Sequence, residues 1–201
     1  MPARPYKSAL RKEAESETLR RIVAATVALH AEKGAMATTH GEIAERAGVS
    51  VPTVYKHFPT RNALLPACMG AVRKEAPVID AAAILSAGDI DTRLRLLVEA
   101  VYTRYRFFHP WIRWTSVDAV SLPEIAEAAR AGRQQLESLV KNVLASSFGD
   151  EIPPQLLALV LVMLDYPTWQ RLDGMLPDAE EVSRVAVHAL QLFIAPLRES
   201  E

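Results

Sequence analysis

The stretch "TTHGEIAERAGVSVPTVYKHF", residues 38–58, constrains the fold more than any other part of the chain. It holds two short segments with apolar residues at helical spacing, separated by a Gly-Val-Ser sequence at 48–50. In the first segment, Thr39 is followed three residues later by Glu42, which is typical of a capping box. We therefore expect a first short helix to begin near His40.

The second segment carries the signals of another helix start. Gly48 stands where a helix exit needs a residue tolerant of left-handed backbone geometry. Ser50 is a suitable N-cap, and Pro52 falls in the first turn, where its missing N–H costs little. Val54 and Phe58 are four residues apart and share a buried face. Two short helices joined by a tight, glycine-containing turn predict a helix-turn-helix over about residues 39–58.

In such a unit the second helix lies in the major groove of DNA, and its N-terminal end favours nearby phosphates. Hydroxyl, imidazole and ammonium groups suit phosphate oxygens and base edges, whereas Val51 and Pro52 suit thymine methyl groups. The predicted DNA-binding residues are Thr38, Thr39, Ser50, Val51, Pro52, Thr53, Tyr55, Lys56, His57 and Arg61. For Lys56, His57 and Arg61, a solvated surface side chain is the simpler alternative.

The same stretch resembles the tetracycline-repressor (TetR) family of bacterial regulators. The matching residues are Thr39, Ile43-Ala44, Gly48-Val49-Ser50, Thr53, Tyr55, Phe58 and Leu64-Leu65. The resemblance is specific over roughly residues 15–70. It implies a dimeric transcriptional regulator with an N-terminal DNA-binding domain and a C-terminal helical domain that binds a small ligand. The position after the capping serine, often basic or polar in relatives, is Val51 here.

The rest of the chain shows no sustained strand alternation, so we predict an all-α fold of about nine helices. The net charge of -1 hides an asymmetry. Residues 1–75 hold 12 Lys and Arg against 7 Asp and Glu, whereas residues 76–201 hold 11 against 17. A basic segment favours contact with a polyanion. We therefore predict a DNA-binding domain at 1–75 and a ligand-binding and dimerisation domain at 76–201.

Other classes of protein lack support in the sequence. No apolar run follows the basic N-terminus, and the longest one, residues 156–164, is shorter than the roughly 20 residues that cross a bilayer. This predicts a cytoplasmic protein without membrane contact. The single cysteine, the scattered histidines and the absence of a phosphate-binding loop predict no metal, no cofactor and no catalysis. The alternative is a helical ligand-binding or scaffolding protein that binds no operator.

Residues 102–114 hold six of the thirteen aromatic residues, too many for a close helical seam. Aromatic walls with a few polar groups are typical of small-molecule pockets. The predicted ligand-binding residues are Tyr105, Phe108, His109, Trp111, Trp114, Asp118, Tyr166 and Trp169. For any single aromatic residue in this set, ordinary core packing is the alternative.

The last two predicted helices, at about residues 154–173 and 178–197, are the candidates for a homodimer interface. The first is apolar almost all round, and such a helix must be covered on all sides. A partner chain would supply the missing cover in an intermolecular four-helix bundle, unless these helices cover the chain's own core. Together with the family resemblance, this predicts a homodimeric repressor that a small-molecule effector releases from a palindromic operator in double-stranded DNA.

Overall fold

The structure, a computed structural model, describes residues 4–149 and 151–198. Residues 1–3 of the predicted DNA-binding domain, and residues 150 and 199–201 of the predicted second domain, lie outside the described residues. The described parts hold eleven helices and no strand: α1 (Arg4–Lys33), α2 (His40–Ala47), α3 (Val51–His57), α4 (Arg61–Glu75), α5 (Ala81–Ser86), α6 (Ile90–Ile112), α7 (Thr115–Asp118), α8 (Pro123–Phe148), α9 (Pro154–Met163), α10 (Tyr166–Asp173) and α11 (Ala179–Arg198).

The predicted all-α class is confirmed, and the helix count is higher than the nine expected. Short helices α5 and α7 account for part of the difference. The apolar segment at 154–173 also divides into α9 and α10, because Pro167 stands in the first turn of a new helix capped by Asp165. Pro110 lies inside α6, which continues to Ile112.

The chain divides into two compact units. Unit 1 comprises residues 1–76 and 110–129, and unit 2 comprises residues 77–109 and 130–201. The charge pattern indicated a division near residue 75, and the structure adds a segment to unit 1 that is distant in sequence. That segment, residues 110–129, holds α7 and the start of α8.

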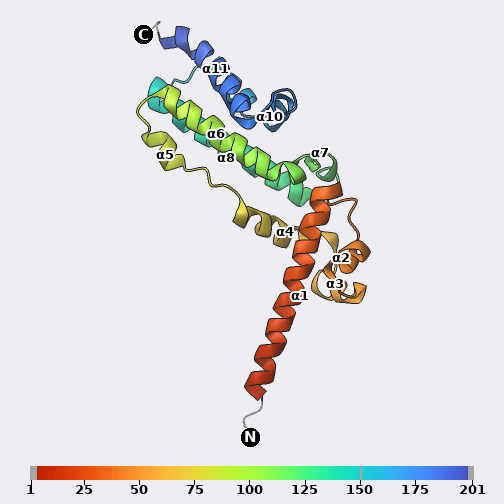
Figure 1. The fold of residues 1–201 in the computed structure, drawn as a ribbon. Coiled ribbons are helices and arrows are strands. Elements are labelled where there is room, and N and C mark those ends of the chain that lie inside the picture. The colour runs from red at the N-terminus through yellow and green to blue at the C-terminus, as the bar shows by residue number, and fades with distance from the viewer. Residues whose placement is uncertain (1–3, 150, 199–201) are drawn as a thin grey trace. The chain divides into compact units, whose positions relative to one another are not determined.

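Unit 1 is built on the C-terminal half of α1, beside which α2, α3 and α4 lie, while the first turns of α1 extend beyond them (Figure 1). Its main core joins all four helices and is completely or almost completely buried. The core includes Ile22, Leu29, Ile43, Ala44, Val54, Phe58, Leu64 and Cys68. A smaller cluster of Ala35, Leu65 and Leu122 joins the segment 110–129 to the same unit.

Unit 2 has a larger core, drawn from α6 and from α8 to α11. It includes Leu94, Leu97, Tyr102, Val140, Leu144, Leu156, Val160, Leu164, Trp169, Ala186 and Leu190. Because Leu156, Val160 and Leu164 have no exposed surface, one side of α9 is covered by its own chain. Part of the cover that this helix needs therefore comes from its own chain, which is one of the two alternatives that the sequence leaves open.

Nowhere in residues 4–149 and 151–198 is a helix both long and apolar enough to cross a membrane.

Candidate nucleic-acid interface

The entry into α2 has the capping box that the sequence predicts. The Thr39 side chain accepts a hydrogen bond from the Glu42 N–H at 3.3 Å, and the Thr39 N–H donates to Glu42 Oε2 at 3.0 Å. The Glu42 pKa falls to about 2, first because Lys33 donates to its carboxylate and then because of the bonds from Thr39. Gly48 ends α2 with a φ of 63°, in the left-handed region. The turn geometry therefore follows from local chemistry.

Helix α3 has a buried side, which anchors it in unit 1, and an exposed side. The Ser50 hydroxyl accepts from the Thr53 N–H and also bonds the Thr53 hydroxyl at 2.7 Å. Val54 is fully buried, whereas Val51 and Tyr55 are 39% and 50% exposed. Pro52 is also exposed, and Thr53 and His57 are half-buried. The exposed side of α3 thus offers apolar, phenolic and cationic groups together.

Tyr55 is oriented by His40, which the sequence predicts only as the start of α2. The rings of His40 and Tyr55 stack with centroids 4.4 Å apart and planes 3° from parallel. His40 Nε2 is also 3.0 Å from the carbonyl oxygen of Phe58, which closes α3. His40 therefore joins the start of α2 to both the middle and the end of α3. In the sequence, this role of His40 is indicated by its position as the first residue after the Thr39 cap.

Lys56 keeps its charge accessible. Its Nζ lies 3.7 Å from Glu15 Oε1 on α1, with 68% of the lysine side chain and 52% of the glutamate side chain exposed. An ion pair so open to solvent contributes about 0–1 kcal/mol. A phosphate group can therefore replace Glu15 at little cost.

Thr38 and Arg61 support the turn between α1 and α2. Thr38 is 3% exposed and donates its hydroxyl to the Gly34 carbonyl at 2.8 Å. Arg61 Nη2 donates to the Thr38 carbonyl at 3.3 Å, and Arg61 Nη1 lies 3.6 Å from Met36 Sδ. Both polar groups thus have partners inside unit 1.

The predicted ligand-binding residues form two groups and one separate residue, Phe108, and the first group belongs to unit 1. Trp111 Nε1 donates to the Val27 carbonyl at 2.9 Å, and Trp114 Nε1 donates to the Ala31 carbonyl at 3.2 Å. Asp118 is 5% exposed, and its oxygens accept from backbone N–H groups of the α1–α2 turn. Trp111 lies at the end of α6, Trp114 caps α7 and Asp118 ends α7, and their polar atoms bond backbone atoms of α1 or of the turn that follows it.

The second group forms an aromatic cluster in unit 2, made of Tyr105, His109, Tyr166 and Trp169. The Tyr166 hydroxyl and His109 Nδ1 are 2.9 Å apart, and Tyr105 donates to the Leu164 carbonyl at 2.8 Å. The Trp169 ring centre lies 5.5–5.9 Å from those of the other three. Burial raises the pKa of Tyr105. Trp169 is 1% exposed, and its indole N–H has no hydrogen-bond acceptor among residues 4–149 and 151–198.

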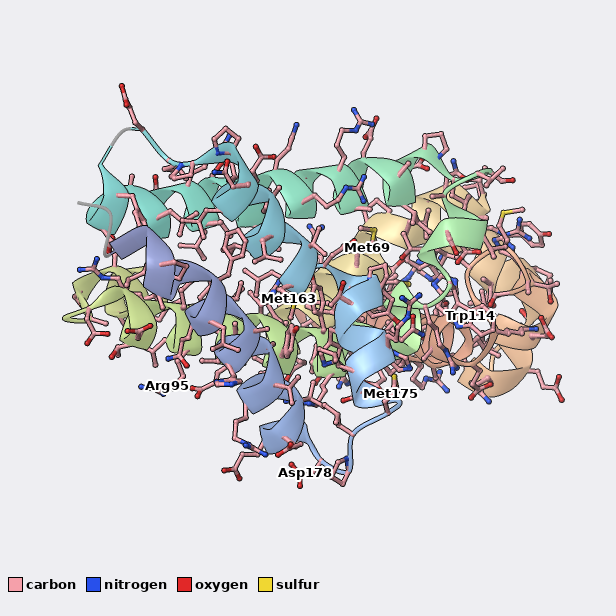
Figure 2. The ribbon with its side chains drawn as sticks, turned by 90° about the horizontal axis from the view of Figure 1, so that it is seen from above. Met69, Arg95, Trp114, Met163, Met175 and Asp178 are labelled. Atoms are coloured by element: carbon pink, nitrogen blue, oxygen red, sulfur yellow. The ribbon has the colours of Figure 1, made fainter. Side chains whose placement is uncertain are left out.

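Phe108 lies apart from this cluster, with the Arg104 guanidinium 4.9 Å from its ring centre. A separate groove of about 710 Å³ runs between α6 and α11, where Figure 2 labels Arg95. Leu192, 63% exposed, is among the residues that line it. Within the described residues, no three His, Cys, Asp or Glu side chains gather closely enough to hold a metal ion.

Comparison with known proteins gives consistent matches. Residues 22–68 match the family described as bacterial regulatory proteins, tetR family. Over 94 residues the chain is 37% identical to the HTH-type transcriptional repressor KstR of Mycolicibacterium smegmatis, and this stretch spans 45% of each protein.

Solved structures share the fold over most of the chain. A transcriptional regulator from Rhodococcus sp. Rha1 matches with a TM-score of 0.62 and 21% identity, over 88% of this chain and 96% of that one. The TetR-like regulator LfrR from Mycobacterium smegmatis, in complex with proflavine, matches with a TM-score of 0.50 and 22% identity, over 89% and 96%. These matches are to transcriptional regulators and not to enzymes.

Proposed function

This chain belongs to the TetR family of bacterial regulatory proteins, and from that premise we propose that it is a DNA-binding transcriptional repressor. The observation that carries the proposal is the exposed side of α3. Val51, Tyr55 and Lys56 face solvent there, while Val54 anchors the helix in the core. A helix held in this way can enter the major groove without unfolding any part of unit 1.

Within this proposal the DNA-contacting residues have distinct roles. Tyr55, oriented by its stacking on His40, donates its hydroxyl to a phosphate. Lys56 exchanges Glu15 for a phosphate or a guanine edge. Val51 and Pro52 contact thymine methyl groups. Residues 1–75 carry DNA binding, and residues 76–201 carry effector binding and dimerisation, with 110–129 supporting the DNA-binding residues.

The operator is palindromic because the protein acts as a homodimer. Two recognition helices related by a two-fold axis reach half-sites about 34–36 Å apart, or a multiple of that distance. The dimer forms through the outer sides of α9 and α11. Large apolar side chains remain exposed there, namely Val162 at 57%, Leu192 at 63% and Phe193 at 37%. A protein with this role acts in the cytoplasm, where bacterial DNA lies.

The effector is a small molecule that binds at the aromatic cluster of unit 2. The buried indole N–H of Trp169 without an acceptor supports this site, because such a group costs free energy until a partner satisfies it. An effector with a hydrogen-bond acceptor next to a flat apolar body fits that chemistry. Binding releases the dimer from DNA only if the effector prefers the conformation that does not fit the operator.

The test is fluorescence anisotropy with duplexes tiled across the DNA upstream of the chain's own gene. We expect one duplex to bind at least about a thousandfold more tightly than a scrambled duplex of the same composition. Tyr55→Phe should weaken that binding by about 1 kcal/mol without changing the thermal unfolding temperature. Equal affinity for every duplex, unchanged by Tyr55→Phe and Lys56→Gln together, would remove α3 from the interface.

A second experiment addresses the effector site. Compounds that change the tryptophan fluorescence of the parent should also lower its operator affinity. Trp169→Phe removes the N–H and keeps most of the aromatic surface, so it should require more compound for release. Trp111→Phe is the matched control, because Trp111 donates to α1 within unit 1. If both variants respond as the parent does, the effector binds elsewhere.

A further inference from the structure

We propose that Asp118 is a positioning residue for DNA binding, which acts by fixing the turn between α1 and α2. This inference rests on the proposed function, because it explains how the helix-turn-helix is held ready for an operator. Asp118 itself contacts no DNA in this proposal. Its two oxygens hold residues 35 and 36, and these lead directly into the Thr38-Thr39 start of α2.

The carboxylate bridges two consecutive backbone donors. The Ala35 N–H donates to Asp118 Oδ2 at 2.8 Å, and the Met36 N–H donates to Oδ1 at 3.0 Å. Hydrogen bonds to a carboxylate are roughly twice as strong as those between neutral groups. Ala35 and Met36 follow α1 after Gly34, where the chain must change direction. One side chain, distant in sequence, therefore replaces the backbone partners that a continuing helix would have provided.

The end of α1 is adapted to this arrangement. In a continuing helix the Ala35 N–H would bond the Ala31 carbonyl. That carbonyl instead accepts from Arg113 Nη2 at 2.9 Å and from Trp114 Nε1 at 3.2 Å. The segment 113–118 thus supplies the acceptor for Ala35 and the donors for Ala31. The same segment therefore provides new partners for both the donor and the acceptor of this missing backbone hydrogen bond.

Gly34 permits the close approach of the carboxylate. Its φ of 84° lies in the left-handed region, where a side chain is strained. A Cβ added there would also lie 3.1 and 3.2 Å from the two Asp118 oxygens and 3.3 Å from Trp114 Cβ. The backbone conformation and the lack of space for a Cβ atom therefore both require glycine at position 34.

The fixed turn continues into the capped start of α2. The Thr38 hydroxyl donates to the Gly34 carbonyl at 2.8 Å, and the Thr38 N–H donates to the Ala35 carbonyl at 3.3 Å. Arg61 then holds the Thr38 carbonyl. The next residue, Thr39, caps α2. The direction in which α2 leaves the turn is therefore set by the residues that Asp118 holds.

A nearby buried histidine does not act as a cationic partner for Asp118. Burial lowers the pKa of His30 to about 4, an effect opposed by the charge of Asp118 and reinforced by Arg61. His30 is therefore neutral near pH 7. The two backbone N–H groups thus provide the direct stabilisation of the carboxylate, and the turn depends on them.

The test uses Asp118→Asn, which keeps the shape and replaces one acceptor oxygen by an amide group that cannot accept. We expect operator affinity to fall by about tenfold or more, measured by anisotropy well below the unfolding temperature. Helix content by circular dichroism and the oligomeric state should match the parent. Glu124→Gln is the control, because Glu124 accepts from Asn62 at 2.9 Å in the same segment and does not touch the turn.

A spectroscopic measurement separates positioning from general stabilisation. In nitrogen-15 spectra of the parent, the Ala35 and Met36 amides should exchange slowly with solvent. In Asp118→Asn at least one should exchange faster, while amides in α8 keep the parent's rates. Gly34→Ala should reproduce the affinity loss with Asp118 intact, and it provides the binding test if Asp118→Asn does not fold.

The results of these experiments separate failure of the inference about Asp118 from failure of the proposed function. Operator affinity of folded Asp118→Asn or Gly34→Ala within about twofold of the parent, a difference below 0.5 kcal/mol, would overturn the inference. Parent amides at 35 and 36 that exchange as fast as exposed ones would do the same. A parent that binds no duplex specifically would refute the proposed function instead, and the amide rates would still decide whether Asp118 holds the turn.

Discussion

Replacing Leu192 by glutamate tests the proposed dimer interface. The exposed fraction of Leu192 in the structure gives the size of the expected loss in dimer stability. Leu192 is 63% exposed in the single chain, so the substitution should disturb the fold of unit 2 little. Burying a whole leucine side chain is worth about 1.5–3 kcal/mol, so burying the exposed 63% is worth about 1–2 kcal/mol per copy. A symmetric dimer contains the residue twice and would lose about 2–4 kcal/mol.

That loss corresponds to a dimer dissociation constant raised about 30-fold or more. The introduced charges weaken the dimer further if the interface excludes water, because an unpaired carboxylate there would lose its hydration. The assay is sedimentation velocity over a range of protein concentrations, together with operator binding, which should weaken as the dimer dissociates.

Val78→Glu is the matched control, since Val78 is 85% exposed and lies between α4 and α5, outside the two helices of the proposed interface. It introduces the same charge and should leave the dimer intact. A Leu192→Glu dimer as tight as the parent would refute the placement of this part of α11 in the interface. A parent that is monomeric at every concentration would refute the dimer itself.

Three further outcomes follow from the described contacts. Lys56→Gln should lower the slope of log affinity against log salt by about 2 per dimer if each lysine holds one phosphate, as a salt titration of operator binding would show. Thr39→Ala should lower the free energy of unfolding by about 1 kcal/mol in urea titrations, and Thr39→Ser should restore it. The pKa of His30 is lowered to about 4 in the folded chain, so the unfolded chain binds more protons between about pH 6.5 and 4, and stability should fall as pH falls through that window. His30→Gln should show a smaller fall in urea titrations at pH 7 and pH 4.5.

Local chemistry made the helix-turn-helix predictable. The Thr39 cap, the left-handed Gly48 and the Ser50 cap each act within a few residues, so their sequence spacing carries the geometry. Val54 and Phe58 were also predictable as core residues, because helical spacing places them on one face. The family match at residues 22–68 lies on the same part of the chain.

The region around the aromatic stretch was less predictable, because spacing shows which side chains share a face and not what that face meets. The polar atoms of Trp111, Trp114 and Asp118 bond the backbone of α1 and of the turn that follows it. Their partners are backbone atoms more than 80 residues away, and backbone atoms leave no signature in a sequence. The burial of one side of α9 in its own chain was not predictable for a similar reason. An apolar residue in the sequence is compatible both with packing in the chain's own core and with packing against a partner.

The separation of Asp118 from its partners has a consequence for the newly made chain. Ala35 and Met36 lie 83 and 82 residues before their acceptor. Synthesis at about 5–20 residues per second leaves those two N–H groups without it for about 4–16 seconds after they are made. The caps of α2 and α3 can form within that time, because their partners are three residues away. A ribosome-bound chain that ends before residue 118 therefore already contains both partners of each cap, whereas it still lacks the carboxylate that holds the turn.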